Sequence, residues 1–187
     1  MIVFEHLGTK QLIGTNYKVA YTQFATRPKT FAEVKTTKCD VLLVRNPVAR
    51  CLSTWKDKCR AAVNPAHVQW CQKELMRELN IDAVESLAGV SFERFVDVLP
   101  KVLLREQHFW PQLYAVDPDV VGKLHRIEDG LPDFGVDMSE QRNSTAHIPN
   151  PAITWNVLQQ INGLYLIDFQ LLGYKAACPR PTSPTSS

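Results

Sequence analysis

The strongest hydrophobic signal in the chain is a run of four aliphatic residues at positions 41–44, between Asp40 and Arg45. A short apolar run of this kind is typical of a strand that is buried on both faces, as in a parallel sheet. Two other apolar stretches, at residues 1–7 and 12–14, predict extended segments earlier in the chain. We therefore expect the strands to lie toward the N-terminal end.

Helical signals begin directly after this run. Asn46-Pro47 has the residue types of a helix N-cap and first helical position, which predicts a helix through residues 48–55. Val68, Cys71, Leu75 and Leu79 recur at helical spacing and predict a second helix.

Two more helices are expected in the second half. Ser91 is a suitable cap for a helix with an apolar face over residues 92–99, which Pro100 would kink or end. Asn150-Pro151 repeats the start signal before an apolar face over residues 153–164, and Gly173 is expected to close that last helix.

Strands followed by helices predict an α/β protein with a small parallel sheet flanked by helices. We expect one domain over residues 1–178. The remaining residues, 179–187, are almost entirely proline, serine and threonine, so they are expected to form a disordered tail.

Composition narrows the class of protein. The 187 residues are 45% hydrophobic and 21% charged with a net charge of +2, which excludes wholesale disorder and gives no general attraction to nucleic acid or anionic membranes. No apolar run approaches the roughly 18 residues of a membrane span, and Glu5 and His6 interrupt the start where a secretory signal would be apolar. We expect a soluble, cytoplasmic protein whose thiols stay reduced; its five cysteines are Cys39, Cys51, Cys59, Cys71 and Cys178.

The segment that follows the aliphatic run carries the most informative chemistry. Arg45 would lie at the carboxyl end of a buried strand, where open α/β sheets bind ligands. A helix N-terminus follows, and Arg50 and Ser53 share one face of that helix. Two guanidinium groups, a hydroxyl group and a helix start predict a phosphate pocket. The alternative is that both arginines form salt bridges at the surface and that Ser53 has no role.

This segment resembles the 3′-phosphate-binding motif of the sulfotransferases, a strand followed by Arg-Asp-Pro-x-x-Arg-x-x-Ser-x-aromatic. The matching residues are Arg45, Pro47, Arg50, Ser53 and Trp55, with Asn46 where the family has Asp. The resemblance implies a P-loop NTPase-like fold and the donor 3′-phosphoadenosine 5′-phosphosulfate (PAPS). Arg45 and Ser53 would bind its 3′-phosphate.

A second motif precedes the strand. Residues 17–24 resemble the 5′-phosphosulfate loop of carbohydrate sulfotransferases, Pro-Lys-Val-Ala-x-Thr-Ser, with Tyr17 in place of proline and Gln23 in place of serine. The donor-binding residues implied by this loop are Lys18, Val19, Ala20, Tyr21, Thr22 and Gln23.

Four later segments resemble the same family in the same order: residues 91–96, 106–112, 120–129 and 164–174. The aromatic residues of the first and last of these segments have the spacing of core residues. Residues 142–144 are similar to the segment that closes over the nucleotide, so Arg142 and Ser144 are further candidates for donor binding.

Sulfuryl transfer requires a base for the acceptor hydroxyl, and histidine and glutamate are the usual ones. We select His108 first and Glu106 second, because both lie in the segment 106–112, and His147 is a third candidate. A hydrogen-bonded structural role is the alternative for His108. No metal is implied, since Lys18 and the arginines supply the positive charge.

The sequence thus predicts a PAPS-dependent sulfotransferase with a small-molecule donor and a carbohydrate acceptor, and neither a nucleic-acid partner nor a membrane span. One alternative is a catalytically degenerate nucleotide-binding module of the same fold. Another is a nucleotide-dependent phosphotransferase, although the chain lacks the G-x-x-x-x-G-K-[ST] loop.

Overall fold

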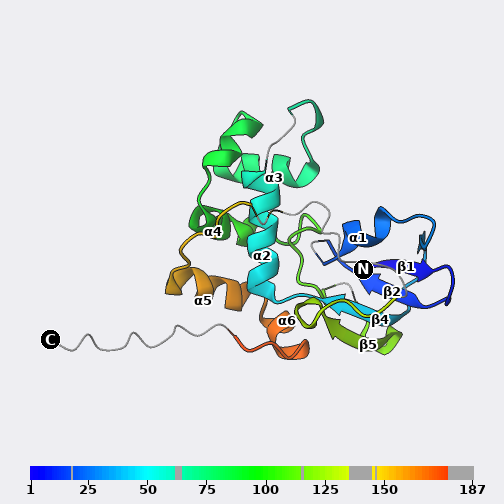
Figure 1. Cartoon of the computed structure of the whole chain (residues 1–187). Helices are drawn as coiled ribbons and strands as arrows, with labels where there is room; N and C mark the ends of the chain where they lie inside the picture. The colour runs from blue at the N-terminus through cyan, green and yellow to red at the C-terminus, as the bar shows by residue number, and fades with distance from the viewer. Residues whose placement is uncertain (18, 62–64, 115, 135–144, 146, 177–187) are drawn as a thin grey trace.

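The computed structural model describes residues 1–17, 19–61, 65–114, 116–134, 145 and 147–176 (Figure 1). The strands are β1 (Ile2–His6), β2 (Leu12–Thr15), β3 (Phe31–Val34), β4 (Cys39–Val44) and β5 (Val121–Arg126). The α-helices are α1 (Tyr21–Ala25), α2 (Pro47–Trp55), α3 (Trp70–Leu79), α4 (Phe92–Val102), α5 (Trp155–Leu164) and α6 (Leu166–Leu171). A π-helical turn, η1 (Lys56–Arg60), continues α2, and the 3₁₀ turns are η2 (Pro65–His67), η3 (Val84–Gly89), η4 (Pro118–Val120) and η5 (Ile127–Asp129).

The strands form one mixed sheet in the order β3-β1-β2-β4-β5. Strands β2, β4 and β5 are parallel, whereas β1 pairs antiparallel with both β2 and β3. The expected parallel pairing is therefore correct for β2, β4 and β5, whereas β1 runs in the opposite direction to the other four strands. The β1–β2 connection explains the difference, because the short turn between His6 and Leu12 reverses the chain and permits only antiparallel pairing.

The sheet is covered on both faces. On one face α1 packs over the sheet through a cluster that includes Phe4, Phe24 and Leu43. On the other face Leu42 and Val44 pack with Leu172, from the end of the α6 segment. All four aliphatic residues at 41–44 are buried, as expected for a strand covered on both sides.

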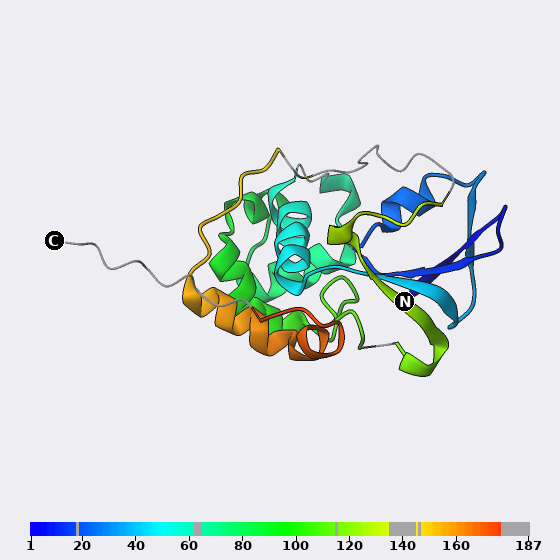
Figure 2. The ribbon, with the colours of Figure 1, turned by 60° about the horizontal axis from the view of Figure 1, so that its bottom comes forward.

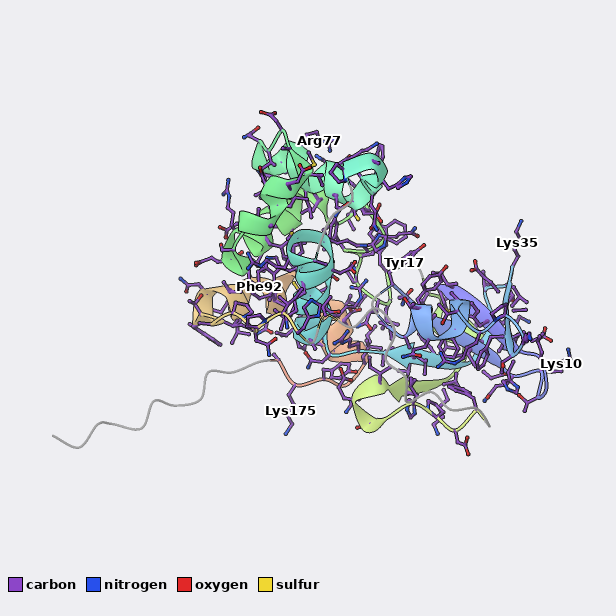
Figure 3. The ribbon with its side chains drawn as sticks, turned by 45° about the horizontal axis from the view of Figure 1, so that its top comes forward. Lys10, Tyr17, Lys35, Arg77, Phe92 and Lys175 are labelled. Atoms are coloured by element: carbon purple, nitrogen blue, oxygen red, sulfur yellow. The ribbon has the colours of Figure 1, made fainter. Side chains whose placement is uncertain are left out.

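A third and larger cluster lies beyond the carboxyl end of β4, among α2, α3, α4 and α5. Figures 1 and 2 show α2 running from the end of β4 into this group of helices, with α5 and α6 along one side. In Figure 3, Phe92 lies within the helical part and Tyr17 lies between the helices and the sheet. The junction between the sheet and the helices is where both sequence motifs are found.

Local signals explain where α2 and α4 begin. The Asn46 side chain accepts hydrogen bonds from the backbone N–H groups of Val48 and Ala49, with Pro47 in the first turn, so the predicted cap is confirmed. Ser91 likewise caps α4 at the N–H of Arg94, and Pro100 lies inside that helix two residues before its end.

The C-terminal helical segment differs from its prediction. The helix start predicted at Asn150-Pro151 is wrong, because α5 begins at Trp155 with Thr154 as its cap. A break at Tyr165 then separates α5 from α6. Gly173 has a φ of 66° directly after this segment, which agrees with its expected role in ending it.

None of the helices in the described part of the chain is both long and apolar enough to cross a membrane. The four cysteines that the structure describes, Cys39, Cys51, Cys59 and Cys71, are all buried free thiols.

Candidate functional site

The two predicted phosphate-binding segments lie side by side at one edge of the sheet. Strands β2 and β4 are parallel neighbours, with Ile13 opposite Val41 and Gly14 opposite Leu42. The segments that follow them, residues 16–20 and 45–46, therefore leave the sheet at the same carboxyl edge. Ligands of open α/β sheets bind at this edge.

The loop at residues 16–20 turns tightly before α1. The N–H of Val19 donates to the carbonyl oxygen of Asn16 at 3.0 Å, and the Thr15 hydroxyl donates to the carbonyl oxygen of Val19. Ala20 has a φ of 56°, in the left-handed region. A turn that combines right- and left-handed residues directs backbone N–H groups toward one point, which suits an anion. Lys18, the predicted cation of this loop, lies outside the described residues.

Three predicted donor-binding residues belong to the short helix α1. The Tyr21 ring lies 5.3 Å from that of Tyr17. The side-chain and backbone oxygens of Gln23 both accept from Arg27. The carbonyl oxygen of Thr22 accepts from Thr26. Val19, which precedes these residues, is fully buried, and its N–H and carbonyl oxygen are both hydrogen-bonded within the turn, so its contact with a donor stays a prediction.

Arg45 is fixed by its backbone at the end of β4. Its N–H donates to Gln112 Oε1 at 2.8 Å, and its carbonyl oxygen accepts from Gln112 Nε2 at 2.7 Å. Burial lowers the pKa of the Arg45 guanidinium, while the charge of Glu128 raises it. Glu128 also accepts from the N–H of Asn46 at 2.7 Å and from the Tyr174 hydroxyl at 2.9 Å. A partly desolvated cation at a sheet edge attracts an anion more strongly than one in water does.

Arg50 has different surroundings from those of Arg45. It is only 2% exposed, and it donates to three backbone carbonyl oxygens: to Tyr17 from Nε at 3.2 Å, and to Trp110 and His108 from the terminal nitrogens at 2.8 and 3.3 Å. This arginine connects the loop at 16–20 with the segment 108–110. The arrangement indicates a positioning role, and contact with a donor stays a prediction.

Ser53 lies two turns into α2, half-buried, on the helix that begins beside Arg45. One turn further on, the buried ammonium group of Lys56 donates to the carbonyl oxygen of Ile148. The segment that contains Ile148 is therefore fixed to the helix that carries Ser53. Arg142 and Ser144, predicted to close over a nucleotide, lie outside the described residues.

His108 and Glu106 form a pair. Glu106 Oε1 accepts from the backbone N–H of His108 at 3.1 Å and lies 2.6 Å from His108 Nδ1. The His108 ring stacks on that of Tyr17, with centroids 4.1 Å apart and planes at 28°. The Tyr17 hydroxyl in turn accepts from the amide of Gln107 at 3.4 Å. The structure thus brings both predicted bases beside the loop at residues 16–20.

The other histidines have no such surroundings. His6 is buried in the β1–β2 turn, where its Nδ1 accepts from the N–H of Thr9. His125 Nε2 lies 2.6 Å from the carbonyl oxygen of Gly130. His67 and His147, the latter our third candidate for a base, are exposed.

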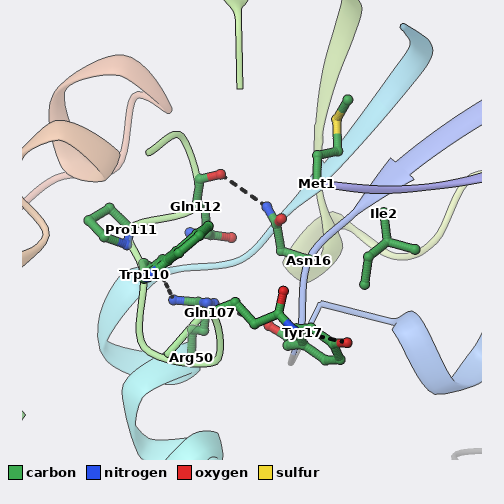
Figure 4. Close-up of a pocket in the computed structure, with 9 residues that line it drawn as sticks. All are labelled: Met1, Ile2, Asn16, Tyr17, Arg50, Gln107, Trp110, Pro111 and Gln112. Carbon is green, nitrogen blue, oxygen red and sulfur yellow. Dashed lines mark hydrogen bonds between the residues drawn. The ribbon is translucent and has the colours of Figure 1, made fainter. Parts of the chain in front are cut away.

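A pocket opens beside Tyr17 (Figure 4). Its walls combine aromatic and amide side chains with the buried guanidinium of Arg50. One of its residues, Trp110, has a buried Nε1 that finds no hydrogen-bond partner among the residues that the structure describes. The lining residues are Met1, Ile2, Asn16, Tyr17, Arg50, Gln107, Trp110, Pro111 and Gln112.

Sequence reasoning missed the part played by Gln112. Its side chain bonds both backbone groups of Arg45, and its carbonyl oxygen accepts from Asn16 Nδ2 at 3.0 Å, so it bridges the two loops (Figure 4). The N–H groups of Gln112 and Leu113 donate to the buried carboxylate of Asp168 at 2.8 and 3.1 Å. Burial raises the pKa of Asp168, and these hydrogen bonds lower it. Asp168 therefore anchors this segment from α6, and only the resemblance of residues 106–112 and 164–174 to one family pointed to either residue.

Together these residues suit a ligand with two anionic groups, one at each loop. A family model described as the sulfotransferase family matches residues 4–138, which contain both loops, both arginines and the His108–Glu106 pair. Neither the curated proteins nor the solved structures include a match to the chain.

Proposed function

The chain belongs to the sulfotransferase family, and from this membership we propose that it transfers the sulfuryl group of PAPS to a hydroxyl group of an acceptor, namely a carbohydrate. The observation that carries the proposal is the placement of the two loops. They follow adjacent parallel strands, Gln112 bridges them, and Arg50 connects the first of them to the start of α2. A donor with phosphate groups at both ends requires two such anion sites at one edge.

Each of the two loops suits one end of the donor. The tight turn before α1 contains the left-handed residue Ala20, and a turn of this kind suits the 5′-phosphosulfate. Arg45 and Ser53 suit the 3′-phosphate, because a guanidinium group and a hydroxyl group are ordinary phosphate ligands. By resemblance, Lys18 supplies the charge at the 5′ end.

The reaction is an in-line displacement at sulfur, by analogy with phosphoryl transfer. The acceptor oxygen forms a bond to sulfur while the bond between sulfur and the 5′-phosphate oxygen breaks. The acceptor proton goes to a base, and the electron pair of the broken bond remains on the phosphate oxygen. The products are a sulfate ester and adenosine 3′,5′-bisphosphate, so the electrons and atoms balance without a metal or a redox step.

His108 is the base in this proposal. It lies beside the loop that would bind the phosphosulfate, and a carboxylate at Nδ1 places the basic lone pair on Nε2, the arrangement that general bases use. Glu106 contacts the ring of His108, so its role is to orient the base.

The acceptor would enter from the side of the pocket beside Tyr17. Aromatic faces and neutral amide groups, such as those of Trp110 and Gln107, are common partners of sugar rings and hydroxyl groups. This composition supports a carbohydrate acceptor, as the resemblance of residues 17–24 also does.

A non-transferring nucleotide-binding module is the second candidate. It is favoured by Gln23, which replaces the serine of the family motif and whose side-chain oxygen accepts from Arg27. A phosphotransferase is disfavoured by the lack of the glycine-rich loop that such enzymes use.

The direct test is transfer of label. The purified protein is incubated with PAPS labelled with ³⁵S and with separate pools of oligosaccharides, phenols and simple alcohols. We expect labelled sulfate ester in the oligosaccharide pool, with one adenosine 3′,5′-bisphosphate released per ester formed. Tight binding of the donor with no ester in any pool would contradict transfer and favour the binding module, and label in the phenol pool alone would contradict a carbohydrate acceptor.

A further inference from the structure

Glu106, Tyr17 and Arg50 all contact His108. Glu106 Oε1 binds both its backbone N–H and its ring Nδ1, and the Glu106 carboxylate itself is buried. Because an ionised carboxylate can only accept hydrogen bonds, this contact favours the tautomer that has the ring hydrogen on Nδ1 and the lone pair on Nε2. The two contacts of Glu106 also limit the rotation of the imidazole.

Tyr17 covers one face of the same ring. The stacked contact, with centroids 4.1 Å apart, limits the tilt of the imidazole. Burial raises the pKa of Tyr17, with smaller contributions from Tyr21 and Glu106, so the phenol stays neutral. Tyr17 is also the first residue after Asn16 in the loop at 16–20, and it is the position at which this chain departs from the family's proline.

Arg50 joins the backbones of these two residues. Its Nε donates to the carbonyl oxygen of Tyr17 and a terminal nitrogen donates to that of His108. Since Arg50 is 2% exposed, this connection is shielded from water. The ionisable groups that contact His108 therefore include Glu106 and Tyr17 at the ring and Arg50 at the backbone carbonyl.

We infer that Glu106, Tyr17 and Arg50 are positioning residues that hold His108 in the Nδ1–H tautomer and fix it to the loop at residues 16–20. The inference rests on the proposed function, in which His108 is the base and that loop binds the donor. Its consequence is that base and donor loop form one rigid unit. Fixing a catalytic group in this way removes orientational freedom before the reaction, and small displacements of such a group can cost about 10²-fold in rate.

The tautomer is measured by ¹⁵N NMR of the full chain, with the His108 signals identified by their loss in His108→Gln. We expect the hydrogen on Nδ1 in the wild-type protein near pH 8. Glu106→Met preserves the length of the side chain and removes the acceptor, so the hydrogen should move to Nε2, the site that a free histidine prefers. Glu93→Gln, an exposed glutamate at the start of α4, is the matched control and should leave the His108 signals unchanged.

The stacked contact between Tyr17 and His108 is tested by enzyme kinetics, independently of the tautomer. Tyr17→Phe preserves the ring contact with His108 and removes only the weak bond to Gln107, so it should reduce kcat far less than a variant that lacks the ring. Tyr17→Leu removes the ring contact, and kcat should fall by about 10²-fold while the KM for PAPS changes little. A structural role alone would not separate these two variants in kcat with an unchanged KM.

If the ring hydrogen of His108 lies on Nε2 in the wild-type protein, the inference is overturned. This result needs no variant, so it holds even if Glu106→Met fails to fold. Equal kcat values for Tyr17→Phe and Tyr17→Leu would overturn the role of the stack. If the wild-type protein has the hydrogen of His108 on Nδ1 but transfers no sulfuryl group, the positioning of His108 is supported and the proposed function is overturned. Failure of the inference and failure of the proposed function therefore give different results.

Discussion

Arg45 and Arg50 belong to one sequence motif, but they make different contacts in the structure. Gln112 bonds both backbone groups of Arg45, whereas three side-chain donors of Arg50 bind backbone carbonyl oxygens. The sequence predicted both as phosphate ligands, because spacing along a helix does not reveal which loops pack against it. The carbonyl oxygens that Arg50 binds come from segments 33, 58 and 60 residues away in the chain.

The first prediction at the scale of residues concerns Arg45. Arg45→Ala should weaken the binding of adenosine 3′,5′-bisphosphate by about 1.5–3 kcal/mol, the range for a hydrogen bond to a charged group. Binding of adenosine 5′-phosphate should change far less, because it lacks the 3′-phosphate. Isothermal titration measures both, with the exposed Arg94→Ala as the control. Equal losses for the two ligands would show that Arg45 does not contact the 3′-phosphate.

The second prediction separates the donor cation from the base. Lys18→Ala should reduce kcat by about 10²–10³-fold with a smaller effect on nucleotide affinity, since the charge that it neutralises grows in the transition state. His108→Ala should reduce kcat by about 10²–10⁴-fold. It should also remove the limb of the pH–rate profile on the acidic side, where protonation of histidine stops it from acting as a base. Normal turnover of both variants would contradict the whole assignment of the site.

Among the helices and strands, the features that depend on neighbouring residues in the sequence, such as helix caps, were predicted correctly. The strand predicted at the aliphatic run 41–44 is confirmed as β4, and so are its burial, the Asn46 cap and the Ser91 cap. The start at Asn150-Pro151 is wrong because a second capping residue, Thr154, lies nearer to the apolar face of α5. Strand β3 was not predicted at all: it is a short edge strand, and no hydrophobic run marks it.

Variants of Asn46 test how much its cap stabilises α2, the helix that begins beside Arg45. Asn46→Ala should lower the free energy of unfolding by about 1 kcal/mol, because the N–H groups of Val48 and Ala49 lose their acceptor. Asn46→Asp, which restores the family residue, should stay close to wild type, since aspartate caps equally well. Urea unfolding measures both variants. An unchanged urea midpoint for the alanine variant would show that the cap does not stabilise α2.

At the scale of the whole molecule, the site lies where the sheet meets the group of helices. Gln112 and Asp168 maintain that junction, one bridging the two loops and the other anchoring the bridge. The order of strand and helix signals could predict an α/β protein with a strand buried on both faces, but the antiparallel pairing of β1 and the contacts of Gln112 depend on long-range packing. Propensity and periodicity carry no information about such contacts.

The buried thiols give a prediction for the packed molecule. Burial raises the pKa of Cys51 and of Cys59 to about 12 and that of Cys71 to about 11, and it also raises the pKa of Cys39. The thiolate is the reactive form, so a Cys178→Ser variant should have no fast-reacting thiol at pH 8 when native and four when unfolded. Titration with Ellman's reagent measures this. A native thiol that reacts as fast as free cysteine would contradict the packing.

The tail gives a second prediction at this scale. The division into a domain at residues 1–178 and a tail at 179–187 rests on composition alone. Deletion of residues 179–187 should leave the melting temperature and the nucleotide affinity nearly unchanged. A loss of several degrees in the melting temperature would show that these residues dock on the domain.

In the proposed function, two adjacent loops bind a nucleotide with phosphates at its 3′ and 5′ ends. A comparison of adenosine 3′,5′-bisphosphate with ATP and Mg²⁺ as ligands of the wild-type protein tests this binding. At 100 times its Kd the bisphosphate should stabilise the fold by about 2.7 kcal/mol, seen as a rise in the melting temperature, whereas ATP with Mg²⁺ should produce little or no rise. A clear rise with ATP and Mg²⁺ and none with the bisphosphate would contradict the account.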